Sequence, residues 1–183
     1  IRALCLVRPV PEVLVWGRDP DKSRAFASRL AGSLGIPVAT AASAEEVVRR
    51  ADVVVTTTPS STPLIEADWL HPGLHITAMG SDAPDKNELA PGVVAGADRF
   101  VCDRRSQSAL LGELRTAIAA AAVPADWPVV ELGEIAAGLK PGRRTDDEVT
   151  VCDLTGTGVQ DTAIASHALC VARARGAGMT VAN

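Results

Sequence analysis

Short apolar segments alternate with helical segments along the chain. The apolar segments lack the polar–apolar alternation of a half-exposed sheet, which is typical of strands covered on both faces. Strands are expected at 13–16, 37–40, 52–58, 74–80, 99–102 and 149–152, and helices at 20–34, 43–50, 106–122 and 160–175. This alternation predicts an α/β fold built on a parallel sheet whose two faces are both covered.

Local signals mark the start of two of these helices. Asp19 can cap a helix that has Pro20 at its first position. Ser43 and Glu46 have the spacing of a capping box, in which each residue binds a backbone N–H near the other. The boundaries of these two helices are therefore set by the residues that flank them.

Composition narrows the classes of function. Hydrophobic residues make up 47% of the 183 positions and charged residues 22%, which excludes a disordered chain. The net charge of −4 and the 3% of aromatic residues argue against a nucleic-acid partner, which requires basic and stacking surfaces. The sequence has no signal peptide and no apolar run long enough to span a bilayer, so a cytoplasmic location without membrane partners is expected.

Neither the cysteines nor the histidines predict a metal site. The four cysteines include no CxxC pair, and Cys102 and Cys152 lie in predicted strands, where buried and inert thiols are expected. The three histidines lack metal-ligand spacing. His75 in a strand and His167 in a helix are expected to be structural, and no metal ion is expected.

The first candidate for ligand chemistry is the tip of the strand at 13–16, where Gly17 is followed by Arg18. In a doubly wound dinucleotide fold, the second strand ends beside the adenosine ribose. An acidic residue there binds the 2′-hydroxyl of NAD, whereas a guanidinium matches the 2′-phosphate of NADP. The alternative is that Arg18 is an exposed loop residue.

Two further candidates follow predicted strands at the edge where open α/β sheets bind ligands. Thr58 either lines the ligand crevice there or simply suits a strand. Gly80 and Ser81 are small enough for a flat ring to approach the backbone, and Asp82 could act as a general acid or base. Lys86 could neutralise a phosphate or Asp82. The alternative is that Asp82 caps a helix and Lys86 lies on its surface.

A glycine-rich turn follows the last predicted strand, at 153–161. It matches a dinucleotide fingerprint poorly, because Asp161 stands at the third glycine position and would face the phosphates. We interpret it as a turn that places the backbone of residues 155–158 at a pocket, with a helix dipole behind it.

Four segments of the sequence together resemble the ornithine cyclodeaminase/mu-crystallin family. They are VWGRDPDKSRAFA, ADVVVTTTPSSTPLI, LHPGLHITAMGSDAPDKNEL and DLTGTGVQDTAIA, and they follow the family's order over almost the whole chain. The segments ITAMGSDAPDKNEL and VCDRRSQSALLGEL most resemble the ectoine-utilisation branch of this family.

The resemblance implies a Rossmann-like, doubly wound parallel sheet that binds NAD(P). Residues 1–148 would form this domain, and residues 149–183 would be a final strand and helix that pack on it or return to a substrate and dimerisation domain. The family's first strand and its GxGxQA loop are expected upstream of Ile1. Residues 1–7 are expected to be the end of an apolar helix. A homodimer is expected for the full-length protein, and the segment alone is expected to be inactive.

The resemblance also implies an activity and a site. Family members transfer a hydride between nicotinamide and the α-carbon of an amino acid or cyclic imine, and the cyclodeaminases convert ornithine to proline with loss of ammonia. Asp82 matches the catalytic aspartate. The residues implied to bind cofactor are Gly17, Arg18, Thr58, Gly80, Ser81 and Lys86, and those implied to bind substrate are Thr155 and Gly156. Arg18 favours NADP(H), with NAD(H) possible.

Two alternatives remain open at this point. The first is a non-catalytic, mu-crystallin-like protein that binds NADP(H), since one fold can serve several functions. The second is another Rossmann reductase, such as a shikimate-dehydrogenase-like enzyme, because VWGRDPDKSRAFA also suits that group. The late TGTGVQD segment argues against this second alternative.

Overall fold

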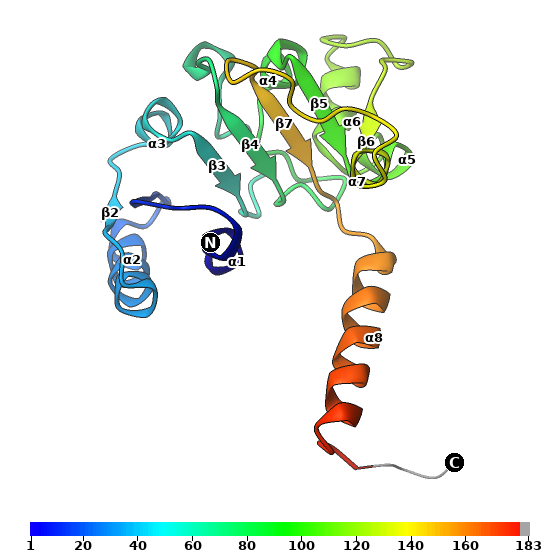
Figure 1. Ribbon diagram of the computed structural model, residues 1–183. Coiled ribbons are helices and arrows are strands. Elements are labelled where there is room, and N and C mark those ends of the chain that lie inside the picture. The colour runs from blue at the N-terminus through cyan, green and yellow to red at the C-terminus, as the bar shows by residue number, and fades with distance from the viewer. Residues whose placement is uncertain (180–183) are drawn as a thin grey trace.

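The computed structural model describes residues 1–179, which fold around parallel β-strands with helices between them (Figure 1). The strands are β1 (Val13–Val15), β2 (Val38–Thr40), β3 (Val53–Thr56), β4 (His75–Ala78), β5 (Arg99–Cys102), β6 (Val130–Glu131) and β7 (Thr150–Asp153). The helices are α1 (Arg2–Val7), α2 (Pro20–Leu34), α3 (Ala44–Arg50), the short 3₁₀ helix η1 (Ala67–Trp69), α4 (Pro91–Gly96), α5 (Arg105–Ser108), α6 (Glu113–Ala119), α7 (Leu132–Ala136) and α8 (Gly158–Ala174).

The strands form two parallel sheets. β1 pairs with β2, and the second sheet has the order β3-β4-β7-β5-β6. The last strand of the chain thus lies in the middle of this sheet, where Val151 is in register with Ile76 of β4 and Phe100 of β5. Among residues 1–179 no strand joins β1 to β3. The predicted parallel α/β architecture is confirmed.

The predicted helix caps of α2 and α3 are also confirmed. Asp19 accepts hydrogen bonds from the backbone N–H groups of Asp21 (3.0 Å) and Lys22 (3.1 Å). Ser43 accepts one from Glu46 N–H (3.0 Å), and the Glu46 carboxylate accepts one from the Ala42 N–H (2.8 Å). Side chains near in sequence satisfy the first N–H groups of both helices, so these helices begin where the sequence predicts.

The main core lies on one face of the five-stranded sheet, under α4 and α6. Ile76, Val151 and Leu114 are fully buried there. The opposite face is less covered among the described residues, because Val55 is 47% exposed and His75 is only partly buried. The prediction that both faces of the sheet are covered is therefore met on one face only.

One predicted helix, 106–122, is wrong in its extent. It is broken into α5 and α6 by a turn at Gly112. A Cβ at Gly112 would overlap the Asp153 carboxylate, which binds both the Ser108 hydroxyl and the Glu113 N–H (3.0 Å). The chain must bend for both groups to reach this carboxylate, and that requirement overrides the helical propensity of the segment. The sequence analysis also missed α4, β6 and α7.

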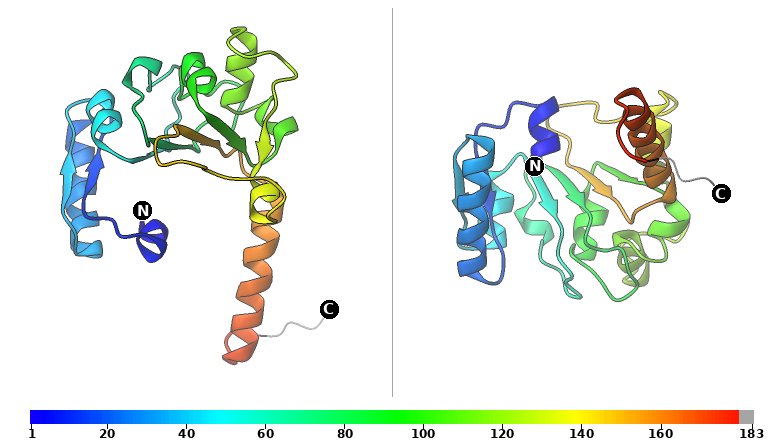
Figure 2. Two further views of the ribbon diagram at one scale, coloured as in Figure 1. Left: turned by 45° about the horizontal axis from the view of Figure 1, so that its top comes forward. Right: turned by 90° about the horizontal axis from the view of Figure 1, so that it is seen from below.

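The final helix, α8, projects from the carboxyl-terminal edge of the sheet (Figures 1 and 2). None of its residues is buried, and the apolar side chain of Ile164 is 64% exposed. Residues 180–183 of the predicted 149–183 segment lie outside the described residues. Within residues 1–179, no helix is both long and apolar enough to cross a membrane.

Candidate active site

The carboxyl-terminal ends of β3, β4 and β7 meet at one edge of the sheet, and most of the predicted site residues follow these ends. Ala78 is in register with Asp153, and the Leu154 N–H donates to the Ala78 carbonyl (2.8 Å). The turn that begins at Gly80 therefore lies beside the turn that contains Thr155. The Met79 N–H donates to the Thr56 carbonyl (3.0 Å), which brings the end of β3 to the same place.

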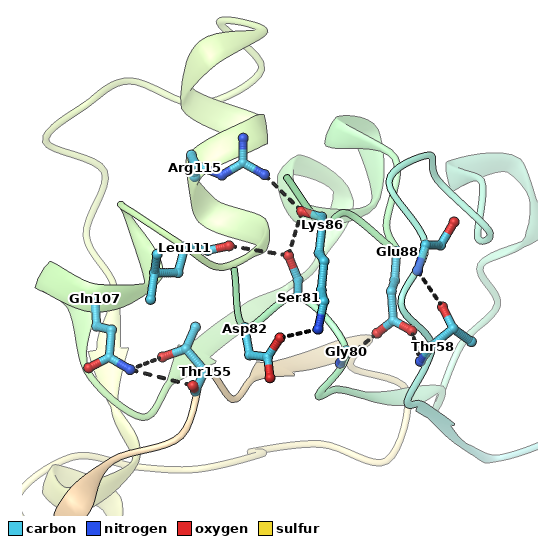
Figure 3. A network of polar contacts seen from close by, with 11 residues as sticks. Thr58, Gly80, Ser81, Asp82, Lys86, Glu88, Gln107, Leu111, Arg115 and Thr155 are labelled. Carbon is cyan, nitrogen blue, oxygen red and sulfur yellow. Dashed lines mark hydrogen bonds and ion pairs between the residues drawn. The ribbon is translucent and has the colours of Figure 1, made fainter. Parts of the chain in front are cut away.

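The Glu88 carboxylate connects the chain after β3 with the chain after β4 (Figure 3). The carboxylate is completely buried and accepts hydrogen bonds from the N–H groups of Thr58 (2.5 Å) and Gly80 (2.8 Å). A Cβ at Gly80 would overlap both the Thr58 carbonyl and this carboxylate, so only glycine fits there. Thr58 and Gly80 thus form a fixed backbone ledge.

Asp82 and Lys86 form an ion pair on the turn after β4. The Lys86 Nζ lies 2.5 Å from the Asp82 Oδ1, and Figure 3 shows the two side chains pointing toward one another. The hydrogen bond from Lys86 lowers the pKa of Asp82, and the same bond raises the pKa of Lys86. Asp82 is therefore an ionised, half-exposed carboxylate. No helix starts at Asp82, so the alternative of a helix cap is excluded.

Ser81 and Arg115 shape this turn from inside. Ser81 is buried, and its hydroxyl donates to the Lys86 carbonyl (2.9 Å), to which the Arg115 guanidinium also donates (2.8 Å). The Ser81 side chain is thus used within the protein. What Ser81 can offer a ligand is its backbone, as the resemblance implies.

The turn after β7 is held by two side chains that the sequence analysis did not identify. The Asp103 carboxylate accepts hydrogen bonds from the N–H groups of Thr155 (2.9 Å) and Gly156 (2.7 Å) and from the Thr155 hydroxyl (3.0 Å). The Gln107 side-chain amide donates to the Thr155 hydroxyl (2.9 Å). Because Thr155 is buried and its hydroxyl is already bound, contact with substrate at this turn would come from the backbone.

Two hollows open along the carboxyl-terminal edges of the sheets. One, of about 380 Å³, is lined by Asp103, Gln107 and the first residues of α8. The other, of about 430 Å³, lies at the ends of β1 and β2, where Gly17, Arg18 and Arg24 line it. Gly17 and Arg18 thus line a hollow to which the Asp82 turn does not contribute.

The remaining cysteine and histidine predictions hold in part. Burial raises the pKa of the Cys102 thiol to about 12 and that of Cys152 to about 11, although Cys152 is only partly buried. The His75 ring binds the Thr150 hydroxyl (2.7 Å), and burial lowers its pKa, so it is a structural histidine. Within residues 1–179 no group of side chains could hold a metal ion. His167 is exposed on α8, so a structural role in the described fold is not supported.

Sequence reasoning missed the buried acids beneath the edge, Glu88, Glu113 and Asp153. The available signal was an acidic residue directly beside an apolar segment, as at Glu88 before Leu89 and at Asp153 after the predicted strand at 149–152. A buried carboxylate needs hydrogen-bond donors, and the sequence does not show which ones it finds.

Known proteins similar to this chain share both its sequence and its fold. The profile of the ornithine cyclodeaminase/mu-crystallin family matches residues 1–171. A putative dehydrogenase of Rhizobium meliloti is 50% identical over 98% of this chain and 54% of its own length. An archaeal alanine dehydrogenase dimer with bound NAD has a TM-score of 0.90 and 34% identity, over 99% of this chain and 55% of that one. The Δ1-pyrroline-2-carboxylate reductase of Thermococcus litoralis, in complex with NADH and L-proline, has a TM-score of 0.92 and 27% identity over 98% and 56%.

These likenesses confirm the Rossmann-like fold. The chain spans about half the length of the relatives that it matches. It belongs to the ornithine cyclodeaminase/mu-crystallin family.

Proposed function

We propose that this chain is the NAD(P)-binding part of an oxidoreductase that transfers a hydride at the α-carbon of an amino acid or cyclic imine. The observation that carries the proposal is the ionised Asp82 carboxylate, paired with Lys86 at the edge where open α/β sheets bind ligands. The two solved relatives are by name an alanine dehydrogenase and a pyrroline-2-carboxylate reductase. Their substrates share a nitrogen on the carbon next to a carboxylate.

The residues present fit a nicotinamide cofactor. Gly80 adds no side chain to the ledge, so a flat ring can approach its backbone closely. Arg18 and Arg24 supply positive charge at the other hollow, where a 2′-phosphate would bind. When bound, the cofactor would supply or accept the hydride.

The residues of the chain would act on the proton and on the charge of the substrate. Asp82, as a carboxylate, can accept a proton from the substrate nitrogen or stabilise the positive charge of an iminium. Lys86 keeps Asp82 ionised and oriented through their hydrogen bond. In a cyclodeaminase, the same carboxylate could also assist the ring closure that releases ammonia.

We infer that Arg18 favours NADP(H). The Arg18→Ala variant should bind NADPH at least tenfold more weakly, because a charge-assisted contact contributes about 1.5–3 kcal/mol, and should bind NADH nearly unchanged. Fluorescence titration with both coenzymes measures this. Arg29→Ala, on the same helix as Arg24 but outside the hollow, is the matched control. Equal weakening of both coenzymes would contradict the 2′-phosphate role.

The catalytic role of Asp82 is tested by Asp82→Asn in the complete protein. Turnover of amino acids or cyclic imines should be lost while coenzyme binding is kept. Full activity in this variant would contradict the site assignment. Coenzyme binding without any turnover by the unaltered protein would instead support the non-catalytic, mu-crystallin-like alternative.

We also propose that α8 leads to a further domain that binds substrate and forms a homodimer. Its support is that no residue of α8 is buried in the described structure, while several apolar side chains on it are exposed, among them Val159, Ile164 and Leu169. Sedimentation of the complete protein tests the dimer.

A further inference from the structure

Three carboxylates lie fully buried beneath the candidate active site, although none of them faces its edge. They are Glu88, Glu113 and Asp153, each with 0% exposure. Burying a carboxylate is costly unless hydrogen bonds compensate it. Three of them in one small region therefore call for an explanation other than packing, for which apolar side chains would serve.

The three carboxylates are connected in series through the backbone. Asp153, at the end of β7, accepts the Glu113 N–H (3.0 Å). The Glu113 carboxylate accepts the Glu88 N–H (2.8 Å). The Glu88 carboxylate in turn accepts the N–H groups of Thr58 (2.5 Å) and Gly80 (2.8 Å). Each carboxylate thus fixes the backbone of the residue that carries the next one.

This series ends at the ledge and at both ends of the Asp82 turn. Gly80, where the turn begins, is held by the Glu88 carboxylate, and Glu88, where the turn ends, is held by the Glu113 carboxylate. The Asp82–Lys86 pair lies between these two fixed points. The Gly80 backbone packs closely against the Glu88 carboxylate, because a Cβ at Gly80 would overlap that carboxylate.

We propose that Glu88, Glu113 and Asp153 are positioning residues that set the Thr58–Gly80 ledge and the Asp82 turn in the geometry required for hydride and proton transfer. This inference rests on the proposed function. Displacing a reacting group by about 1 Å can lower a rate by about 100-fold. Arg18 lies in the loop that follows β1 of the other sheet, so the adenosine half of the cofactor site should not depend on the series.

Glu88→Gln and Glu113→Gln test the inference in the complete protein. Each glutamate accepts hydrogen bonds with both carboxylate oxygens, whereas a glutamine has only one acceptor oxygen. Each variant should therefore weaken the series at one residue. We expect kcat to fall by about 10- to 100-fold, and the coenzyme Kd to change much less than kcat because the adenosine half of the site does not depend on the series. The deuterium isotope effect on kcat, measured with coenzyme labelled at the transferred hydrogen, should rise because hydride transfer becomes slower relative to the other steps. A loss of folded protein alone would change neither the isotope effect nor the Kd.

Glu148→Gln is the matched control. Glu148 also has a partly buried carboxylate that accepts a backbone N–H, from Arg144 (2.8 Å), but it precedes β7 at the opposite edge of the sheet. Its kcat and isotope effect should equal those of the unaltered protein. If folded Glu88→Gln and Glu113→Gln behave like this control, the inference is overturned.

A second measurement tests the series of carboxylates and requires no enzyme activity. In ¹H–¹⁵N spectra, Glu113→Gln should shift the amide resonances of Thr58 and Gly80, which Glu113 reaches only through Glu88. If the glutamine variants fail to fold, Ser108→Ala is the alternative, because it removes one hydrogen-bond donor to Asp153, the first carboxylate of the series. This variant should also shift the amide resonances of Thr58 and Gly80. If the Thr58 and Gly80 resonances do not shift, the inference that the three carboxylates act in series is overturned. If the unaltered protein turns over no substrate, the proposed function fails, whereas these spectra still decide whether the three carboxylates are coupled.

Discussion

The Asp153→Asn substitution should change the pH dependence of stability in a defined direction. Burial raises the pKa of Asp153 from 3.8 to about 7, against the opposing effect of the hydrogen bond from Ser108. At about pH 5 the folded protein therefore holds a proton on this carboxyl that the unfolded chain has released. Asparagine has nearly the same shape but does not titrate, so it removes this proton uptake and little else.

The sign follows from which state binds the proton. Because the folded state binds it more tightly, the free energy of unfolding contains a contribution that is fully present below the unfolded pKa and is lost as pH rises through the folded pKa. At about 1.4 kcal/mol for each pKa unit, the shift corresponds to about 4 kcal/mol in total, of which about 3 kcal/mol is lost between about pH 5 and about pH 8. Relative to the unaltered protein, Asp153→Asn should gain that amount over this range.

Urea unfolding at several pH values, followed by circular dichroism, measures the effect as a difference between the two proteins. Burial also raises the pKa of Glu113 to about 7, but Glu113 titrates in both proteins, so its contribution largely cancels. Asp126→Asn, at an exposed carboxylate, is the control for removing a surface charge. If the Asp153→Asn difference is constant over this pH range, or favours the unaltered protein at high pH, the argument from burial is refuted.

Three other changes test the local structure. Gly80→Ala should lower the free energy of unfolding by about 1–3 kcal/mol, because its Cβ would overlap the Thr58 carbonyl and the Glu88 carboxylate; thermal unfolding measures this, and unchanged stability would contradict the tight ledge. Ser43→Ala should lower it by about 1 kcal/mol, because the first turn of α3 loses its acceptor; the matched variant Ser43→Asp should restore it. Cys102 should stay unmodified by iodoacetamide at about pH 8 in the folded protein, since its thiol has a pKa of about 12; rapid labelling detected by mass spectrometry would show that it is not buried as described.

The sequence by itself determined the features that depend on neighbours a few residues away. Asp19 and the pair of Ser43 and Glu46 bind N–H groups two to four residues distant, so the start of α2 and of α3 could be predicted. The four-residue spacing of Asp82 and Lys86 likewise allowed the prediction that Lys86 could neutralise Asp82. The valine-rich segments gave the strands, because β-branched side chains suit a buried sheet.

Only the tertiary structure decided which distant groups meet. Asp153 binds the Glu113 N–H 40 residues away, and the bend at Gly112 that this contact requires replaces the single helix that local propensity predicts. Glu88 reaches the Thr58 N–H across 30 residues. The Asp153 contact depends on the insertion of β7 between β4 and β5, and the Glu88 contact depends on the pairing of β3 with β4. No local pattern specifies this strand order. Hydrophobic periodicity fixes which face of an element is buried, whereas the partners of a buried carboxylate are fixed only when the whole sheet has assembled.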